Sequence, residues 1–203
     1  MSTIVVVRRA GLAVLAADTL TKAGHSKDPA EYVANHQKSF RVGDSALATA
    51  GPTSMKAILQ AHFSGLKRPP RLDSVAALVR TWSGVHAALK QGWFMNTTEG
   101  SDAAFESTRS DVLIANPHGI FGVSSHRVVQ EFTRFYAYGS GSEYAMGAMW
   151  AAWADEELGA EAIACLGVAA AAEFDGATGL PMTVEVVKLA RAAKGQRRRR
   201  KRG

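Results

Sequence analysis

Four short runs that resemble strands, grouped in two pairs by tight turns, stand out in the first fifty residues of the chain. The runs are Thr3–Arg9, Leu12–Asp18, Lys38–Val42 and Ser45–Ala50, and the turns within each pair are Ala10-Gly11 and Gly43-Asp44. Such runs joined by two-residue turns that contain glycine are typical of β-hairpins. We therefore expect two hairpins here, with a loop over residues 19–37, where polar residues show no clear period.

The rest of the chain continues this pattern with paired helices and further strands. We expect helices over about Thr53–Leu66, Ser74–Gln91, Glu143–Glu156 and Ala160–Glu173, and strands over Asp111–Asn116, Ile120–Ser124 and Met182–Leu189, with another strand over Arg127–Phe132 or Phe135–Tyr138. The order along the chain is thus strands, two helices, strands, two helices and a final strand. This order lacks the regular alternation of strand and helix that builds a parallel βαβ sheet. The order predicts an α+β fold with two antiparallel sheets and helices packed outside them.

Length and charge bound the organisation of the chain. The 203 residues are 47% hydrophobic, which suits one domain over residues 1–190. The net charge of +6 comes from six basic residues at positions 197–202, because without them 18 basic residues face 18 acidic ones. Residues 191–203 are thus expected to form a flexible basic tail. Since the body is neutral, we do not expect a nucleic-acid partner despite that tail.

Cysteine use and hydropathy indicate the compartment. Cys165 is the only cysteine, so no disulfide can form within the chain and a reducing compartment is expected. No apolar run is long enough to cross a membrane, and the chain does not begin like a secretory signal. We therefore expect a cytoplasmic protein without membrane contact.

The sequence gives no sign of a metal or a cofactor. The six histidines are scattered and lack the spacing of zinc ligands. The segment Gly139-Ser-Gly-Ser-Glu-Tyr144 approaches a dinucleotide fingerprint, but Tyr144 replaces its third glycine and no βαβ unit surrounds it. We expect neither group to be bound.

The start of the chain is itself a candidate site. Initiator methionine is generally removed before a small residue, which would leave Ser2 with a free α-amine beside its hydroxyl. An α-amine titrates near pH 8, so part of it is neutral at pH 7 and can accept the hydroxyl proton during attack. A strand that begins at Thr3 would hold this residue in place.

Four segments resemble the proteasome-type N-terminal nucleophile (Ntn) hydrolases, in particular the HslV-like members and a bacterial proteasome homologue (BPH) described from beta-proteobacteria. The segments are STIVVVRRAGLAVLAAD at the start, KSFRV with ALATAG, YGSGSEYAMGAM, and AAAAEFDGATG. They occur in the family's order and cover most of the chain. The resemblance implies a four-layer αββα sandwich, like that of a proteasome β-subunit.

The resemblance also implies roles for individual residues. Ser2 takes the position of the nucleophile, Asp18 and Lys38 those of a paired aspartate and lysine beside the α-amine, and Gly51 that of the backbone donor to the oxyanion. Ser140, Asp175 and Thr178 match the supporting hydrogen-bond network, and Thr49 and Thr53 flank the first specificity pocket. The nucleophile is serine rather than threonine, and Gly92–Ser110 is expected to be an insertion.

The implied activity is hydrolysis of unfolded polypeptides inside a chamber of stacked six- or seven-membered rings, with an ATP-dependent unfoldase as a possible partner. Two alternatives stay open from the residues. One is a ring-forming scaffold of the same fold without turnover, and the other is a small-molecule amidase of the same superfamily. Ring size, cleavage specificity and the removal of Met1 are not determined by the sequence.

Overall fold

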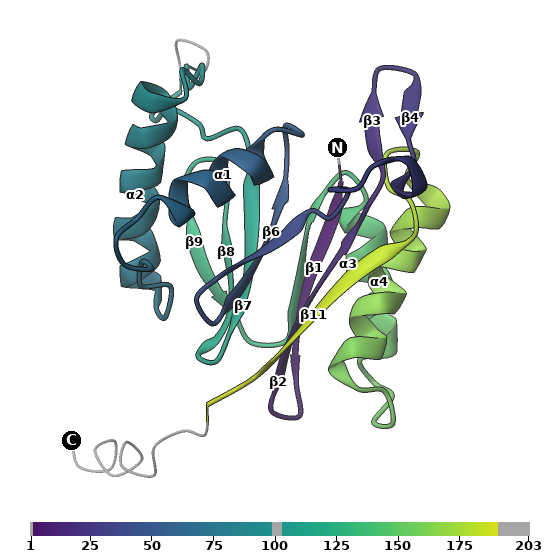
Figure 1. Ribbon diagram of the computed structural model, residues 1–203. Helices are drawn as coiled ribbons and strands as arrows, with labels where there is room; N and C mark the ends of the chain where they lie inside the picture. The colour runs from purple at the N-terminus through teal and green to yellow at the C-terminus, as the bar shows by residue number, and fades with distance from the viewer. Residues whose placement is uncertain (1, 99–102, 191–203) are drawn as a thin grey trace, which may run out of the picture.

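The computed structural model describes residues 2–98 and 103–190, which form four stacked layers (Figure 1). Two antiparallel sheets face each other in the middle, with a pair of helices on the outer face of each. This arrangement confirms the α+β fold expected from the order of the elements and the αββα sandwich implied by the resemblance.

One sheet carries the start of the chain. Its strand order is β10-β1-β2-β11, and every neighbouring pair is antiparallel. Helices α3 and α4 cover its outer face (Figure 1). The elements of this half are β1 (Thr3–Arg9), β2 (Leu12–Asp18), β10 (Phe135–Gly139), α3 (Ser142–Ala152), α4 (Ala160–Phe174) and β11 (Met182–Lys188).

The second sheet has the order β5-β6-β7-β8-β9 and is covered by α1 and α2. Helix α2 begins as predicted, because the side chain of Ser74 accepts a hydrogen bond from the Ala77 N–H. The elements of this half are β5 (Ser39–Val42), β6 (Ser45–Ala50), α1 (Met55–Ser64), α2 (Val75–Gly92), β7 (Asp111–Asn116), β8 (Gly119–Val123) and β9 (Val129–Phe132).

Strand β1 shows why the central strands read as continuous apolar runs. Successive side chains of a strand point to opposite faces of its sheet. Ile4 and Val6 pack between the two sheets, whereas Val5 and Val7 pack against α3 and α4. All four side chains are fully buried. The strand that follows Ser2 is therefore fixed from both sides.

The prediction of a loop over residues 19–37 was wrong in part. This segment contains the hairpin β3 (Thr21–Ala23) and β4 (Ser26–Asp28) and a short 3-10 helix, η1 (Ala30–Tyr32). Gly24 turns the hairpin with a φ of 58°, a conformation that glycine adopts without strain. The strands are polar and stand apart from both main sheets, so no alternation of apolar residues marked them.

The remaining differences concern the ends of elements and segments without regular structure. The 127–138 region contains two strands, β9 and β10, rather than one. Residues 93–98 and 103–110 form neither helix nor strand. The predicted basic tail lies outside the described residues. Among the residues that are described, no helix is long and apolar enough to span a membrane.

Candidate active site

Ser2 lies immediately before β1 and is almost fully buried, with 5% of its surface exposed. Its carbonyl oxygen accepts a hydrogen bond from the Ser140 N–H at 3.0 Å. Strand β10 runs antiparallel beside it, with Gly139 opposite Thr3. The main chain of Ser2 is thus held by the neighbouring strand.

Two glycines allow this close approach. Gly139 has a φ of 104°, and a Cβ atom there would lie 1.8 Å from the carbonyl oxygen of Ser2. A Cβ at Gly141 would lie 2.5 Å from Thr3 Oγ1. Real Cβ atoms do not approach other atoms so closely, so residues 139 and 141 must both lack a side chain.

Asp18 ends β2 with a side chain that has no exposed surface. Its Oδ1 accepts hydrogen bonds from the Thr3 N–H at 2.9 Å and from Lys38 Nζ at 2.7 Å. Its Oδ2 accepts from the N–H groups of Leu20 at 3.1 Å and Gly179 at 3.2 Å. The carboxylate therefore joins β1, the start of β5 and the segment that leads into β11.

Lys38 immediately precedes β5 and reaches back to Asp18, as the resemblance implied. Its ammonium also donates to the Leu20 carbonyl at 2.7 Å, and 12% of its side chain is exposed. Burial raises the pKa of Asp18 and lowers the pKa of Lys38, and the attraction between the two charges opposes both shifts. Because Asp18 Oδ1 also binds the Thr3 N–H, the ammonium lies close to the Ser2–Thr3 peptide.

A second hydrogen-bond network connects Thr3 to the segment after α4. Asp175 Oδ2 accepts from the hydroxyls of Ser140 and Thr178, each at 2.6 Å. Because the Thr178 hydroxyl donates to Asp175, it accepts from Thr3 Oγ1, which lies 2.6 Å away. Burial raises the pKa of Asp175, but the hydrogen bonds from Ser140 and Thr178 outweigh it and leave this pKa below 3.8.

Gly51 lies between two pockets that both include Ser2. It follows β6 directly with a φ of 144°, and a Cβ there would lie 2.7 Å from the Arg109 carbonyl oxygen. Glycine is therefore required at this position. Its place beside Ser2 is consistent with the backbone donor that the resemblance implied.

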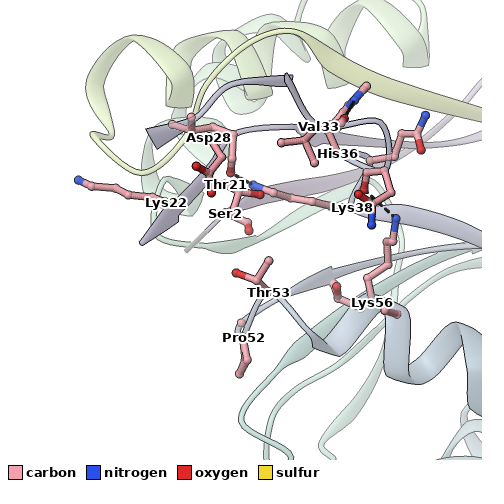
Figure 2. Close-up of a pocket in the computed structure, with 16 residues that line it drawn as sticks. Ser2, Thr21, Lys22, Asp28, Val33, His36, Lys38, Pro52, Thr53 and Lys56 are labelled. Carbon is pink, nitrogen blue, oxygen red and sulfur yellow. Dashed lines mark hydrogen bonds between the residues drawn. The ribbon is translucent and has the colours of Figure 1, made fainter. Parts of the chain in front are cut away.

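The first pocket has a volume of about 270 Å³ and contains the predicted specificity residues (Figure 2). Thr49 is buried on β6, and Thr53 is exposed ahead of α1. Leu20 and Lys38 line the opposite wall. The residues predicted for nucleophile, charged pair and first pocket thus come together in one place.

The second pocket, of about 580 Å³, was not predicted from the sequence. It lies on the other side of Ser2 and is lined by residues such as Arg109, Asp111 and Tyr138. Burial, followed by the charge of Asp111, raises the pKa of Tyr138 to about 12, so this phenol stays protonated at neutral pH. Arg109 belongs to the segment predicted as an insertion, for which the resemblance offered no role.

Other contacts of the site were also missed. Thr3 contributes a side chain as well as an amide, and Lys56 enters the first pocket from α1. Neither residue belongs to a motif, so the sequence did not indicate a role for the Thr3 side chain or for Lys56. Within residues 2–98 and 103–190, no group of three or more histidine, cysteine or acidic side chains is placed to hold a metal ion.

Comparison with solved structures places the chain in a family. Two structures of BPH from Thiobacillus denitrificans, one of them in complex with epoxomicin, each match with a TM-score of 0.88 and 52% identity over 93% of this chain. The match covers 100% of the protein chain in the epoxomicin complex and 98% of the protein chain in the other structure.

A more distant match extends the likeness of fold. HslV from Trypanosoma brucei matches with a TM-score of 0.61 and 19% identity, over 92% of this chain and 99% of its own. No protein-family model and no curated protein sequence matches. At 52% identity over nearly its whole length, the chain belongs to the bacterial proteasome homologues, which are HslV-like members of the proteasome-type Ntn hydrolases.

Proposed function

We propose that this protein is a peptidase of the proteasome type in which Ser2 is the nucleophile and its own α-amine is the general base. One observation carries the proposal. Asp18 Oδ1 binds both the Lys38 ammonium and the Thr3 amide, so a cation is held next to the residue that begins the strand. A cation at that position disfavours the protonated α-amine and so favours the neutral form that acts as the base.

The reaction follows from these positions. After removal of Met1, the neutral α-amine of Ser2 accepts the hydroxyl proton while Oγ attacks the carbonyl carbon of a peptide bond. The oxyanion accepts a hydrogen bond from the Gly51 N–H. The amine then passes its proton to the leaving nitrogen as the peptide bond breaks. Water, deprotonated by the same amine, hydrolyses the ester and releases Ser2.

The charged groups around Ser2 have supporting roles. The Lys38 charge disfavours protonation of the nearby α-amine, which keeps more of it in the basic form. Asp18 holds Lys38 and offsets the cost of burying its charge. Ser140, Asp175 and Thr178 fix the main chain and the Thr3 side chain next to the nucleophile. Thr49 and Thr53 bind the substrate residue that precedes the scissile bond.

The proposal extends to assembly. Membership among the bacterial proteasome homologues supports stacked rings of six or seven copies that enclose the sites and admit unfolded polypeptides, with an ATP-dependent unfoldase as partner. Residues 1–190 would act as one folding unit in each copy. The mass of the purified particle tests the ring, because a monomeric species at working concentration would contradict it.

Intact-mass spectrometry with epoxomicin tests the chemistry. Epoxomicin, with which one of the Thiobacillus denitrificans structures is in complex, is an epoxyketone, and its two electrophilic positions can engage the hydroxyl and the amine of an N-terminal serine. We expect the purified chain to lack Met1 and to gain the mass of one inhibitor molecule. Ser2→Ala should assemble normally and gain none. Retention of Met1 on most molecules would block the amine and favour a scaffold without turnover.

A further inference from the structure

The first pocket has two walls. One consists of Leu20, the β3–β4 hairpin and the segment from Val33 to Lys38, and the other of the end of β6 and the start of α1. Ser2 lies on one side of the pocket and the Lys56 ammonium on the other, as Figure 2 shows. A side chain that enters beside Ser2 therefore extends toward Lys56.

Most charges that line this pocket are already balanced or directed outward. Asp18 neutralises Lys38. Lys22 donates to the Gly176 carbonyl at 3.4 Å and points away from the cavity, and Asp28 is exposed at the end remote from Lys56 (Figure 2). Among the lysine and aspartate side chains that line the pocket, Lys56 is the one that is neither paired with an opposite charge nor directed outward.

Lys56 is partly buried and has a neutral partner. Its ammonium donates to the Asn35 carbonyl at 3.2 Å, and no carboxylate among the described residues pairs with it. Burial lowers the pKa of Lys56, and no acidic neighbour opposes this shift. An ammonium has three N–H donors, so two remain for a ligand. A carboxylate would restore the solvation that the ammonium loses on burial.

The rest of the lining suits a short acidic side chain. Leu20, Val33 and Ala57 supply apolar surface for methylene groups, and the Thr49 and Thr53 hydroxyls can hydrogen-bond a carboxylate. Because Lys56 lies across the pocket from Ser2, glutamate reaches it more easily than aspartate does. We propose that this pocket selects an acidic residue, above all glutamate, immediately before the scissile bond, a specificity that rests on the proposed peptidase function.

Hydrolysis of matched peptides tests this specificity. Acetylated peptide aminomethylcoumarins that end in Glu, Asp, Gln, Leu or Arg differ at the residue that would occupy the pocket. We expect kcat/KM for Glu to exceed that for the isosteric Gln by about tenfold or more, since a charge-assisted hydrogen bond replaces a neutral one. Asp should fall between them, and Arg should be the poorest.

Substitutions at position 56 show whether Lys56 causes the preference. Lys56→Met should bring the Glu and Gln peptides to equal rates, and Lys56→Glu should favour Arg over Glu. Lys67→Glu makes the same charge change on the exposed loop after α1, outside the pocket, and should keep the parental order. Equal rates for Glu and Gln in the parental protein, or a Glu preference that survives Lys56→Met, would overturn the proposal.

A binding experiment separates this inference from the catalytic one. Ser2→Ala can bind acetyl-peptide amides that end in Glu or Gln without any turnover. Fluorescence polarisation of labelled peptides should show tighter binding of the Glu peptide to Ser2→Ala, and Lys56→Met in this background should abolish the difference. This result would support the acidic pocket even if epoxomicin failed to label Ser2, whereas equal binding would reject the pocket even if labelling succeeded.

Discussion

Two lysine–carboxylate pairs in this protein share the same chemistry and differ in burial. Lys38 and Asp18 pair inside the site, where the aspartate has no exposed surface. Lys90 and Glu106 pair at the surface between α2 and the segment before β7, with exposed fractions of 53% and 37%. Water screens the second pair, while in the first each group depends on its protein partners.

The surroundings of each pair reinforce this contrast. Asp18 also accepts three backbone N–H groups, so its charge organises the main chain around Ser2. Hydrogen bonds lower the pKa of Glu106 to about 2, with the largest contribution from Lys90 and the next largest from His86. Such a shift on an exposed group reports good hydrogen bonding and little about stability. The same kind of ion pair thus organises the main chain around Ser2 in one place and links two surface segments in the other.

The largest expected effect comes from Lys38→Ala, which removes the cation of the buried pair. The α-amine of Ser2 would then be protonated more readily, and labelling by epoxomicin should slow by about 100-fold or more. Lys38→Arg should fail as well, because the longer planar group does not fit the position of the ammonium. Time-resolved intact mass measures both. A Lys38→Ala variant that assembles and reacts at the parental rate would falsify the proposed mechanism.

Asp18→Asn should produce the next largest effect, and mainly on stability. From the sequence, Asp18 is expected only to position Lys38, so the activity should fall less than in Lys38→Ala. The structure adds the backbone donors, one or more of which would face the new amide NH₂ group. Breaking a buried charge pair costs about 3–5 kcal/mol. Thermal denaturation should show a clear loss, and an unchanged melting temperature would mean that Asp18 carries little of the local structure.

Ser140→Ala should have a moderate effect that depends on pH. The lowered pKa of Asp175 means that its network stabilises the fold above pH 3.8 and loses this contribution as the pH falls through the still lower folded value. Without the Ser140 hydroxyl this pKa rises, so acid unfolding should begin at a higher pH. Melting curves from pH 3 to 7 measure the shift. Ser83→Ala, which removes a hydroxyl bonded within α2, should leave the acid limb in place.

The smallest effect is expected for Lys90→Ala. Exposed ion pairs contribute little, so neither the melting temperature nor the rate of Ser2 labelling should change measurably at about 0.15 M salt. Time-resolved intact mass, as for Lys38→Ala, and thermal denaturation, as for Asp18→Asn, provide the comparison. If labelling slowed, the segment that Glu106 anchors would be coupled to Ser2 through Arg109, which lines the second pocket, and the contrast between the two pairs would not hold.

The first three strands explain why much of the fold and the centre of the site were predictable. Continuous apolar runs and glycine turns marked β1, β2 and their neighbours, and the position of Asp18 at the end of β2 follows from the same pattern. Lys38 came from the resemblance, since a lone lysine before a strand usually faces solvent. The resemblance also supplied Asp175, because contacts between residues so distant in sequence leave no local pattern.

Other parts of the site depended on features that a sequence does not display. The hairpin β3–β4 is polar on both faces and does not join the main sheets, so it lacks the alternation that marks a half-buried strand. Lys56 is a single lysine in the first turn of α1, and its direction toward the pocket depends on where α1 packs. Arg109 reaches the second pocket from a segment without regular structure. Such a segment has no periodic pattern of apolar residues from which its path could be predicted.

The two glycines beside Ser140 have a consequence for the interpretation of variant-effect maps. Any side chain at position 139 would displace the carbonyl of Ser2, and any at 141 would displace the hydroxyl of Thr3. In a saturation screen both positions should be as intolerant as Ser2, the proposed nucleophile, although neither carries a reacting group. Intolerance at these glycines therefore reflects the path of the main chain through Ser2 and Thr3, and a scoring scheme based on tolerance alone would count the glycines as catalytic.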